Sequence, residues 1–127
     1  MDDLVAYRLS SADEKLNSAR ILLEAGQYKD SIGRSYYALF SSIRAVLATE
    51  NVDFSKHAGV ISYFQRNYIK TGIFDVKYSK YLTTAFQIRN SCDYDDFYIV
   101  SQDQAAEQYA HASEMISAVK TYLYSQK

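Results

Sequence analysis

Apolar side chains recur every three or four residues along most of the chain, the period that places them on one face of a helix. The first such stripe covers residues 5–23. Gly26 follows it, where a helix commonly ends in the left-handed conformation. A second stripe covers residues 32–47, and a third covers residues 60–68 behind Ser55, whose hydroxyl suits a helix N-cap. The first half of the chain therefore predicts three helices.

The second half predicts two more helices. The fourth extends from about residue 78 to residue 92, and residues 93–100, which are acidic and aromatic, are typical of a loop. Ser101 and Gln104 have the spacing of a capping box. Behind them, residues 105–123 carry the apolar face of a fifth helix. No stretch alternates as a strand does.

The predicted fold class is all-α, an up-and-down bundle of four main helices plus a shorter helix, in one domain over residues 1–127. The chain has no proline and four glycines, which favours long helices joined by short loops. Gly33 lies inside the second predicted helix, where it costs about 1 kcal/mol against alanine. A close crossing with the first helix would explain that glycine.

The amino-acid composition bears on the oligomeric state and the cellular compartment of the protein. Thirteen tyrosines suit a bundle with a semi-polar seam or an oligomer interface. Cys92 is the single cysteine, so an intrachain disulfide and a thiolate zinc site are excluded, and the cytoplasm is the expected compartment. We expect no membrane association, because no apolar run approaches membrane-spanning length and the start does not read as a signal peptide.

Charge is unevenly spread along the sequence. The net charge of −1 argues against a general nucleic-acid coat protein. Residues 29–89, however, hold nine Lys/Arg against four Asp/Glu. The candidates for a basic surface beside Arg89 are Lys56, Arg66, Lys70, Lys77 and Lys80. A solvated helix face is the alternative that this pattern favours.

Arg89 is the first candidate for chemistry, because it shares a predicted helix face with Leu82 and Phe86. A guanidinium on an apolar stripe must be paired and hydrogen-bonded. Asp93, one turn later, has the spacing of a partner. A structural ion pair at the end of a helix is the alternative to a functional arginine.

The sequence gives little support for a metal site. A di-iron bundle needs two sets of carboxylate and histidine ligands, and the sequence offers a single pair, Glu107 and His111. Three aspartates at 93, 95 and 96 suit Mg²⁺ chemically, but a solvated acidic loop is favoured. We expect no metal and no cofactor. His57 lies one turn before Ile61 on the apolar side, so it is read as a partly buried histidine that could approach Arg89.

Four short segments between residues 25 and 96 share a pattern with a known family. They are Gln27–Ser31 with Arg34–Phe40, Lys56–Ile61, Lys70–Asp75, and the most specific one, Arg89-Asn90-x-x-Asp93-Tyr94. Together they resemble the HEPN domain, and most closely the small stand-alone HEPN proteins of bacteria and archaea. Many of those proteins are encoded beside a minimal nucleotidyltransferase.

The resemblance implies a helical dimer, and many HEPN dimers are metal-independent ribonucleases. Their signature is an arginine, a polar residue such as asparagine, and a histidine four to six residues after the arginine. The histidine takes the 2′-hydroxyl proton and the arginine stabilises the phosphorane-like transition state. Arg89 and Asn90 match, but Tyr94 stands where the histidine is expected, and free tyrosine titrates near pH 10. Either His57 supplies the base from another helix, or the protein is a weak or inactive relative.

In toxin–antitoxin pairs of this family, the nucleotidyltransferase partner attaches AMP to a tyrosine beside the motif. The matching position here is Asp96, so Tyr94 and Tyr98 are approximate candidates. The resemblance thus predicts a homodimeric, RNA-directed toxin or defence component with a nucleotidyltransferase-type antitoxin. The alternatives are a non-catalytic module that binds a nucleotide or a partner, and a purely structural dimer. The predicted site consists of Arg89 as the phosphate-binding group, Asn90 and Asp93 orienting it, Tyr94 lining the cleft, and His57 as an outside base.

Overall fold

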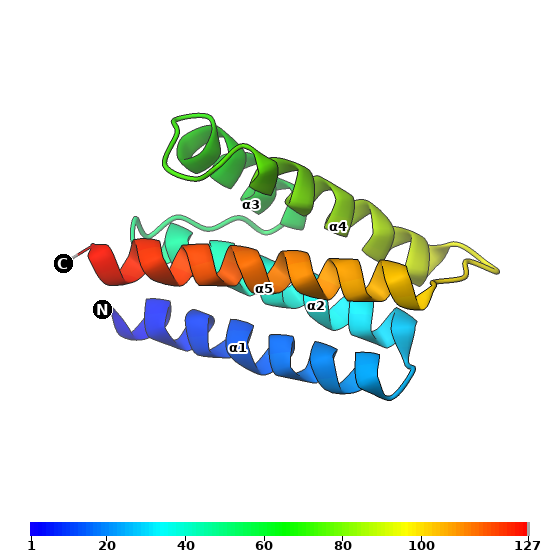
Figure 1. The fold of residues 1–127 in the computed structure, drawn as a ribbon. Helices are drawn as coiled ribbons and strands as arrows, with labels where there is room; N and C mark the ends of the chain where they lie inside the picture. Colours follow the sequence, from blue (N-terminus) through cyan, green and yellow to red (C-terminus); the bar gives the residue numbers. More distant parts are fainter. Residues whose placement is uncertain (127) are drawn as a thin grey trace.

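The computed structural model describes residues 1–126, which fold into a bundle of helices (Figure 1). No strand occurs in this range, so the all-α prediction is confirmed. In Figure 1, α1, α2 and α5 lie side by side, and α3 and α4 cover the remaining side of α2. The elements are α1 (Asp3–Glu24), α2 (Tyr28–Ala48), α3 (His57–Phe64), the π-helix η1 (Gln65–Ile69), α4 (Lys77–Tyr94) and α5 (Gln102–Ser125).

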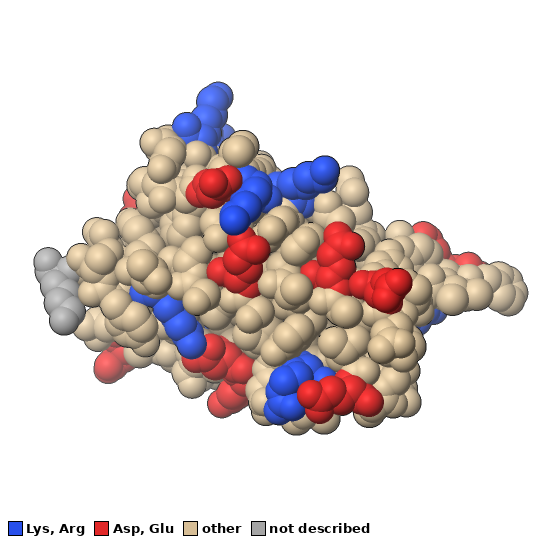
Figure 2. Space-filling model, viewed as in Figure 1, with Lys and Arg blue, Asp and Glu red and all other residues tan. Residues whose placement is uncertain are grey.

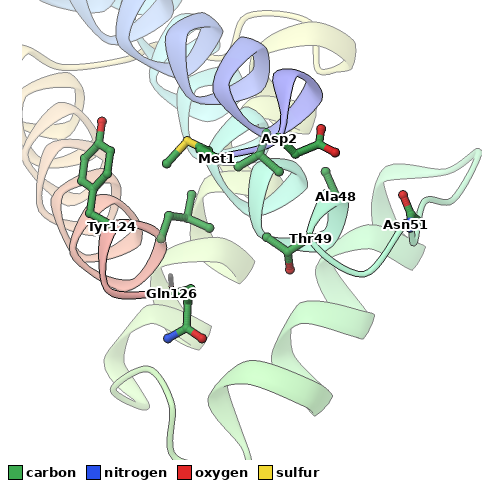
Figure 3. Close-up of a pocket in the computed structure, with 9 residues that line it drawn as sticks. Met1, Asp2, Ala48, Thr49, Asn51, Tyr124 and Gln126 are labelled. Atoms are coloured by element: carbon green, nitrogen blue, oxygen red, sulfur yellow. The ribbon is translucent and has the colours of Figure 1, made fainter.

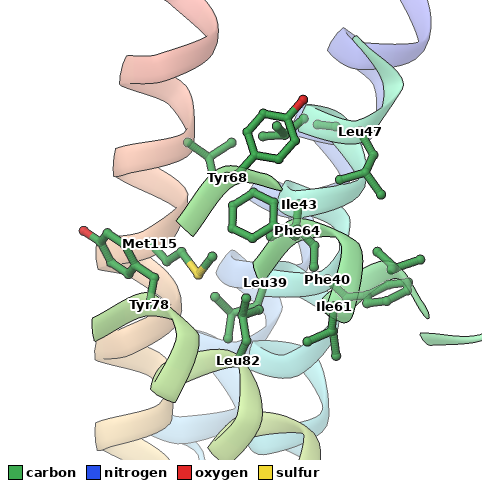
Figure 4. Packing of buried hydrophobic residues seen from close by; sticks show 14 of the residues in the cluster. Leu39, Phe40, Ile43, Leu47, Ile61, Phe64, Tyr68, Tyr78, Leu82 and Met115 are labelled. Carbon is green, nitrogen blue, oxygen red and sulfur yellow. The ribbon is translucent and has the colours of Figure 1, made fainter. Parts of the chain in front are cut away.

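The central helix is α2, which contacts α1, α3, α4 and α5. Thirteen of its 21 residues are buried, as its apolar stripe predicts. Figure 4 shows its side chains meeting those of the surrounding helices around Phe64 of α3, which is fully buried. The main contributors are Leu39, Ile43 and Leu47 from α2, Ile61 from α3, Tyr68 from η1, Leu82 from α4 and Met115 from α5.

Small residues allow α1 and α2 to pack closely where they cross. The buried Ser31 hydroxyl donates to the carbonyl oxygen of Ala19 at 2.8 Å, and Ala12 packs against Ala38. Gly33 does not take part, because a Cβ placed on it would have nothing within 4 Å. The prediction that Gly33 marks the crossing is therefore wrong. Gly33 instead borders an open groove.

Two predicted helix boundaries are also wrong. The third helix begins at His57 with Lys56 at the N-cap position and no side-chain cap, so Ser55 does not cap it. The fourth helix continues through Asp93 and Tyr94, which were expected in a loop. An ion pair between Asp93 and a residue one turn earlier supports this additional helical turn.

The connection between α4 and α5 projects from one end of the bundle (Figure 1). Phe97 is 97% exposed and has a positive φ of 62°, a conformation rare for a bulky residue. The predicted N-cap of α5 is confirmed, since the Ser101 hydroxyl accepts from the backbone N–H of Gln104 at 3.1 Å. The Gln104 side chain does not complete the capping box, because its amide donates to the Tyr98 hydroxyl instead.

A π-helix interrupts what the sequence predicts as one third helix. The N–H of Lys70 donates to the carbonyl of Gln65 at 2.8 Å, five residues back. Hydrogen bonds to residues outside η1 stabilise this π-helical turn. The Gln65 amide donates to the Ser79 hydroxyl of α4, and the Tyr68 hydroxyl donates to the carboxylate of Glu50 beyond α2.

Candidate functional site

Arg89 is enclosed by groups from two helices. Its Nε lies 2.8 Å from Oδ2 of Asp93, an ion-pair contact in which the N–H bond does not point at the oxygen. Its Nη2 donates to the Tyr37 hydroxyl at 2.7 Å. The guanidinium carbon also lies 5.5 Å and 5.3 Å from the ring centres of Tyr36 and Tyr37. With 17% of its side chain exposed, Arg89 is held in one position and still reaches solvent.

His57 lies on the other side of the same pair of tyrosines. Its Nδ1 is 2.9 Å from the Tyr36 hydroxyl, and its ring is 4.0 Å from that of Phe40. The Tyr37 ring meets the imidazole edge-on at 5.9 Å. The structure therefore brings His57 close to the aromatic residues that hold Arg89, although 31 positions separate the two in the chain.

Burial lowers the pKa of His57, and the positive charges of Arg89 and Arg44 lower it further. The imidazole is accordingly neutral at pH 7, as a general base must be. Burial also raises the pKa of Tyr36, which keeps its hydroxyl protonated. His57 has a free lone pair on Nε2 when Nδ1–H donates to the Tyr36 oxygen, and this is the tautomer that could accept a proton from a ligand.

Two open grooves meet at Tyr37. The Arg34 groove, of about 550 Å³, is bordered by Lys29, Asp30, Gly33 and Arg34 of α2 and by Asp93, so two carboxylates line it beside two cations. The Arg44 groove, of about 430 Å³, follows along the same helix and includes His57. Tyr37 is the one residue that lines both. The other charged residues of the Arg44 groove are Arg8, Lys15 and Arg44.

The basic residues beside Arg89 are not those that the sequence suggested. Arg66 and Lys70 line a separate groove with Val76, and Lys77 pairs with Glu114 at 2.6 Å. Figure 2 shows the face over α5, where blue and red side chains are interspersed. The cations nearest the site come instead from α1 and the exposed side of α2. Sequence reasoning missed those of α1 because that segment carries at least as many acidic residues as basic ones.

A further pocket, of about 440 Å³, lies between the start of α1 and the ends of α2 and α5 (Figure 3). It shares no residue with the two grooves. Its one carboxylate, Asp2, already accepts from the backbone N–H of Leu4 as the cap of α1. Over residues 1–126, no three His, Cys, Asp or Glu side chains gather as a metal site requires. Among the helices described, none is both long and apolar enough to span a membrane.

Comparison with protein families identifies this architecture. The model of the HEPN domain matches residues 5–122. The chain belongs to the HEPN family. The resemblance proposed from the four segments is thereby confirmed.

Three relatives place this HEPN protein among small prokaryotic proteins. It is 39% identical over 83 residues to a protein named "Putative toxin" from Methanocaldococcus jannaschii, covering 65% of this chain and 62% of the relative. A UPF0332 protein of Pyrococcus horikoshii is 39% identical over 62% of this chain and 56% of its own. A UPF0332 protein of Thermotoga maritima is 28% identical over 94% and 90%. The aligned part thus spans less than two thirds of the first two relatives.

Some residues of the HEPN motif contact the candidate site and others do not. Asn90 is half-buried and makes no hydrogen bond to Arg89 among the described residues. Tyr94 ends α4, is 75% exposed and lines neither groove. Tyr98 accepts a hydrogen bond from Gln104. Arg89 therefore contacts Asp93 directly and is connected to His57 through Tyr36 and Tyr37, whereas Asn90 and Tyr94 are not part of this arrangement.

Tyr37 is the site residue that the sequence did not single out. It falls in the segment Arg34–Phe40, where its spacing marks it as one more aromatic residue of a helix. Its partner Arg89 is 52 residues away, so no local pattern connects them. The double tyrosine at 36 and 37 is the only signal, because adjacent side chains of a helix point in different directions and one ring of the pair is free to turn toward a neighbouring site.

Proposed function

We propose that this HEPN protein acts on RNA as a homodimeric, metal-independent ribonuclease of the toxin or defence type. One observation carries the proposal. Arg89, fixed between Asp93 and Tyr37, is bonded to the one residue that the two grooves share, and a neutral His57 packs against Tyr36 and Tyr37. A phosphodiester anion fits this arrangement, since its charge meets a guanidinium that is already oriented.

Each group has a distinct role in this proposal. His57 accepts the proton of the RNA 2′-hydroxyl through Nε2, the 2′-oxygen attacks the neighbouring phosphorus, and the 5′-oxygen leaves and takes a proton from water, which gives a 2′,3′-cyclic phosphate and a 5′-hydroxyl. Arg89 stabilises the negative charge that builds on the phosphate oxygens in the transition state. Asp93 keeps the guanidinium in place through their 2.8 Å contact. Tyr94 does not replace the motif histidine, because it is 75% exposed and lines neither groove.

A toxin role is supported by the name of the relative from Methanocaldococcus jannaschii. We propose a nucleotidyltransferase-type antitoxin that adds AMP to a tyrosine at the end of α4. Tyr94 is the better acceptor of the two candidates, because it is 75% exposed, whereas the Tyr98 hydroxyl is engaged by Gln104. Intact-mass measurement after incubation with such a partner and ATP tests this. An AMP adduct that persists in Tyr94→Phe would refute the assignment.

The direct test is cleavage of labelled total RNA and tRNA by purified protein in EDTA. Arg89→Ala should lower the rate by about 10²- to 10³-fold, as loss of a charge-stabilising donor does elsewhere. His57→Gln should lower it by about 10²- to 10⁴-fold. Tyr94→Phe is the matched control and should retain activity. Equal cleavage by wild type and Arg89→Ala would exclude this site as the source of the activity.

A second function is favoured by one observation, the tyrosine in place of the motif histidine. In this alternative the protein is a non-catalytic HEPN module, and the same grooves hold a nucleotide or a segment of the nucleotidyltransferase partner. Wild-type protein that binds RNA or a nucleotide through Arg89 without cutting RNA at high concentration would establish it. In that case Arg89→Ala should weaken binding, because its guanidinium meets the charge of the bound anion.

A further inference from the structure

The two grooves form one continuous track along α2. The Arg34 groove covers α2 from Lys29 to Tyr37, and the Arg44 groove covers it from Tyr37 to Arg44. These positions share one side of the helix, because their spacing follows its three-to-four-residue repeat. The fifteen helical rises of 1.5 Å between Lys29 and Arg44 make the track about 22 Å long. That is about six times the 3.4 Å rise per phosphate of a stacked strand.

Each end of the track holds cations that form no ion pair, although Asp30 and Asp93 also line the first groove and Asp53 lies beside the second. Lys29 and Arg34 border one groove and are exposed, with no ion-pair partner among residues 1–126. At the other end, Asp53 compensates Arg8 and Arg44 with contacts of 3.2 Å and 2.7 Å. Lys15 is bound there only to the hydroxyl of Ser11. The cations without a carboxylate partner therefore lie on both sides of Tyr37.

Tyr37 itself has a free hydrogen to donate. Its hydroxyl oxygen accepts from Arg89, and within the described chain no acceptor receives the hydroxyl hydrogen. The Tyr37 hydroxyl oxygen is 2.7 Å from Nη2 of Arg89. An anion in contact with this hydroxyl would therefore also lie beside the guanidinium. Tyr7, 70% exposed at the rim of the Arg44 groove, adds an aromatic face suited to stacking on a base.

We propose that the track binds one unpaired RNA strand, with Tyr37 donating to the phosphate between two flanking subsites, one at Lys29 and Arg34 and the other at Lys15. This inference rests on the proposed RNA-directed function and specifies its substrate as single-stranded. Unpaired cations of α1 and α2 on both sides of Tyr37 match the phosphates of a single strand, and stacking on the exposed ring of Tyr7 requires a base that is not already stacked in a duplex.

The test is binding of a fluorescent 2′-O-methyl oligouridylate of about ten nucleotides, a length within the range of single-strand sites. Such an RNA lacks the 2′-hydroxyl that cleavage requires, so affinity is measured whether or not the protein is a ribonuclease. Fluorescence anisotropy is recorded over a range of salt concentrations. The variants are Arg34→Gln, Lys15→Gln and their combination, and Tyr37→Phe, with Arg66→Gln and Lys80→Gln as exposed controls outside both grooves.

We expect each groove variant to lower the slope of log affinity against log salt by about 0.7, and the combination by about 1.4. Tyr37→Phe should weaken binding by about tenfold, the loss of one hydrogen bond to a charged group, without changing the slope, because no charge is removed. The two controls should match wild type. A duplex of the same length should bind more weakly than the single strand.

Four results would overturn the inference: no wild-type binding, an unchanged slope in either groove variant, an equal effect in the controls, or a duplex that binds as tightly. A slope unchanged by Arg34→Gln together with an altered sedimentation mass would assign the grooves to contact between copies of the chain. The proposed ribonuclease function is judged separately. If the protein binds the oligouridylate but does not cleave ordinary RNA, the ribonuclease function is refuted and the single-strand track stands. If it cleaves RNA but these variants have no effect on binding, the track is refuted and the ribonuclease function stands.

Discussion

Gly33→Ala is expected to stabilise the protein, which is unusual for a substitution beside a candidate site. Gly33 lies in the middle of α2, and a Cβ added there meets no atom within 4 Å. Alanine in a helix interior is favoured over glycine by about 0.8–1.0 kcal/mol. With a urea m-value of about 1–3 kcal/mol/M, the unfolding midpoint should rise by about 0.3–1 M. Circular dichroism in urea measures this shift.

Two other glycines provide matched controls. Gly26 has a φ of +78°, so Gly26→Ala forces the left-handed conformation and should cost about 1–2 kcal/mol. Gly59→Ala gains the same helix propensity in α3, but its Cβ would lie 3.2 Å from Cβ of Phe54, so it should gain less than Gly33→Ala. A loss of stability in Gly33→Ala would refute the reasoning, because it would mean that the added Cβ is not free of contacts.

Three further substitutions test the fold and the site. Phe64→Ala empties the centre of the core and should lower the free energy of unfolding by about 3–5 kcal/mol in urea, whereas a loss below about 1 kcal/mol would contradict the packing in Figure 4. Ser101→Ala removes the cap of α5 and should cost about 1 kcal/mol by the same measurement, with Ser101→Asp as the variant that restores it. Because the folded pKa of His57 is lowered, the unfolded chain takes up its proton first, and wild-type stability should fall as the pH drops below about 6.5. His57→Gln should make that dependence shallower, and an identical pH profile would show that the imidazole is not protected in the folded protein.

The long helices are predictable from sequence because their signals are local. The stripes of α1, α2 and α5 are continuous, and Gly26 and Ser101 mark the end of one helix and the start of another in the expected way. The short elements depend on contacts from elsewhere in the chain. His57 opens α3 without a cap while its ring packs on Phe40, and η1 is held by Ser79 and Glu50. No neighbouring residues encode these contacts.

In the candidate site too, contacts within one helix could be predicted from the sequence, whereas contacts between helices could not. The contact of Arg89 with Asp93 follows from their spacing of four on one helix, so sequence alone could propose it. The contact of Arg89 with Tyr37 joins α4 to α2 and has no counterpart in the spacing of either helix. The same limit applies to Lys15, which enters the Arg44 groove only because α1 packs beside α2.

The exposed connection that carries Phe97 has a practical consequence for the chain as a whole. A protease that cuts beside this phenylalanine would separate residues up to 97 from the segment that contains α5. Since α5 packs on α1 and α2, the two fragments should remain assembled through noncovalent contacts alone. Folding would then become an association whose extent depends on concentration. An isotopically labelled α5 fragment could therefore be exchanged into the nicked protein, leaving α1, α2 and α4, which bear the candidate site, unlabelled.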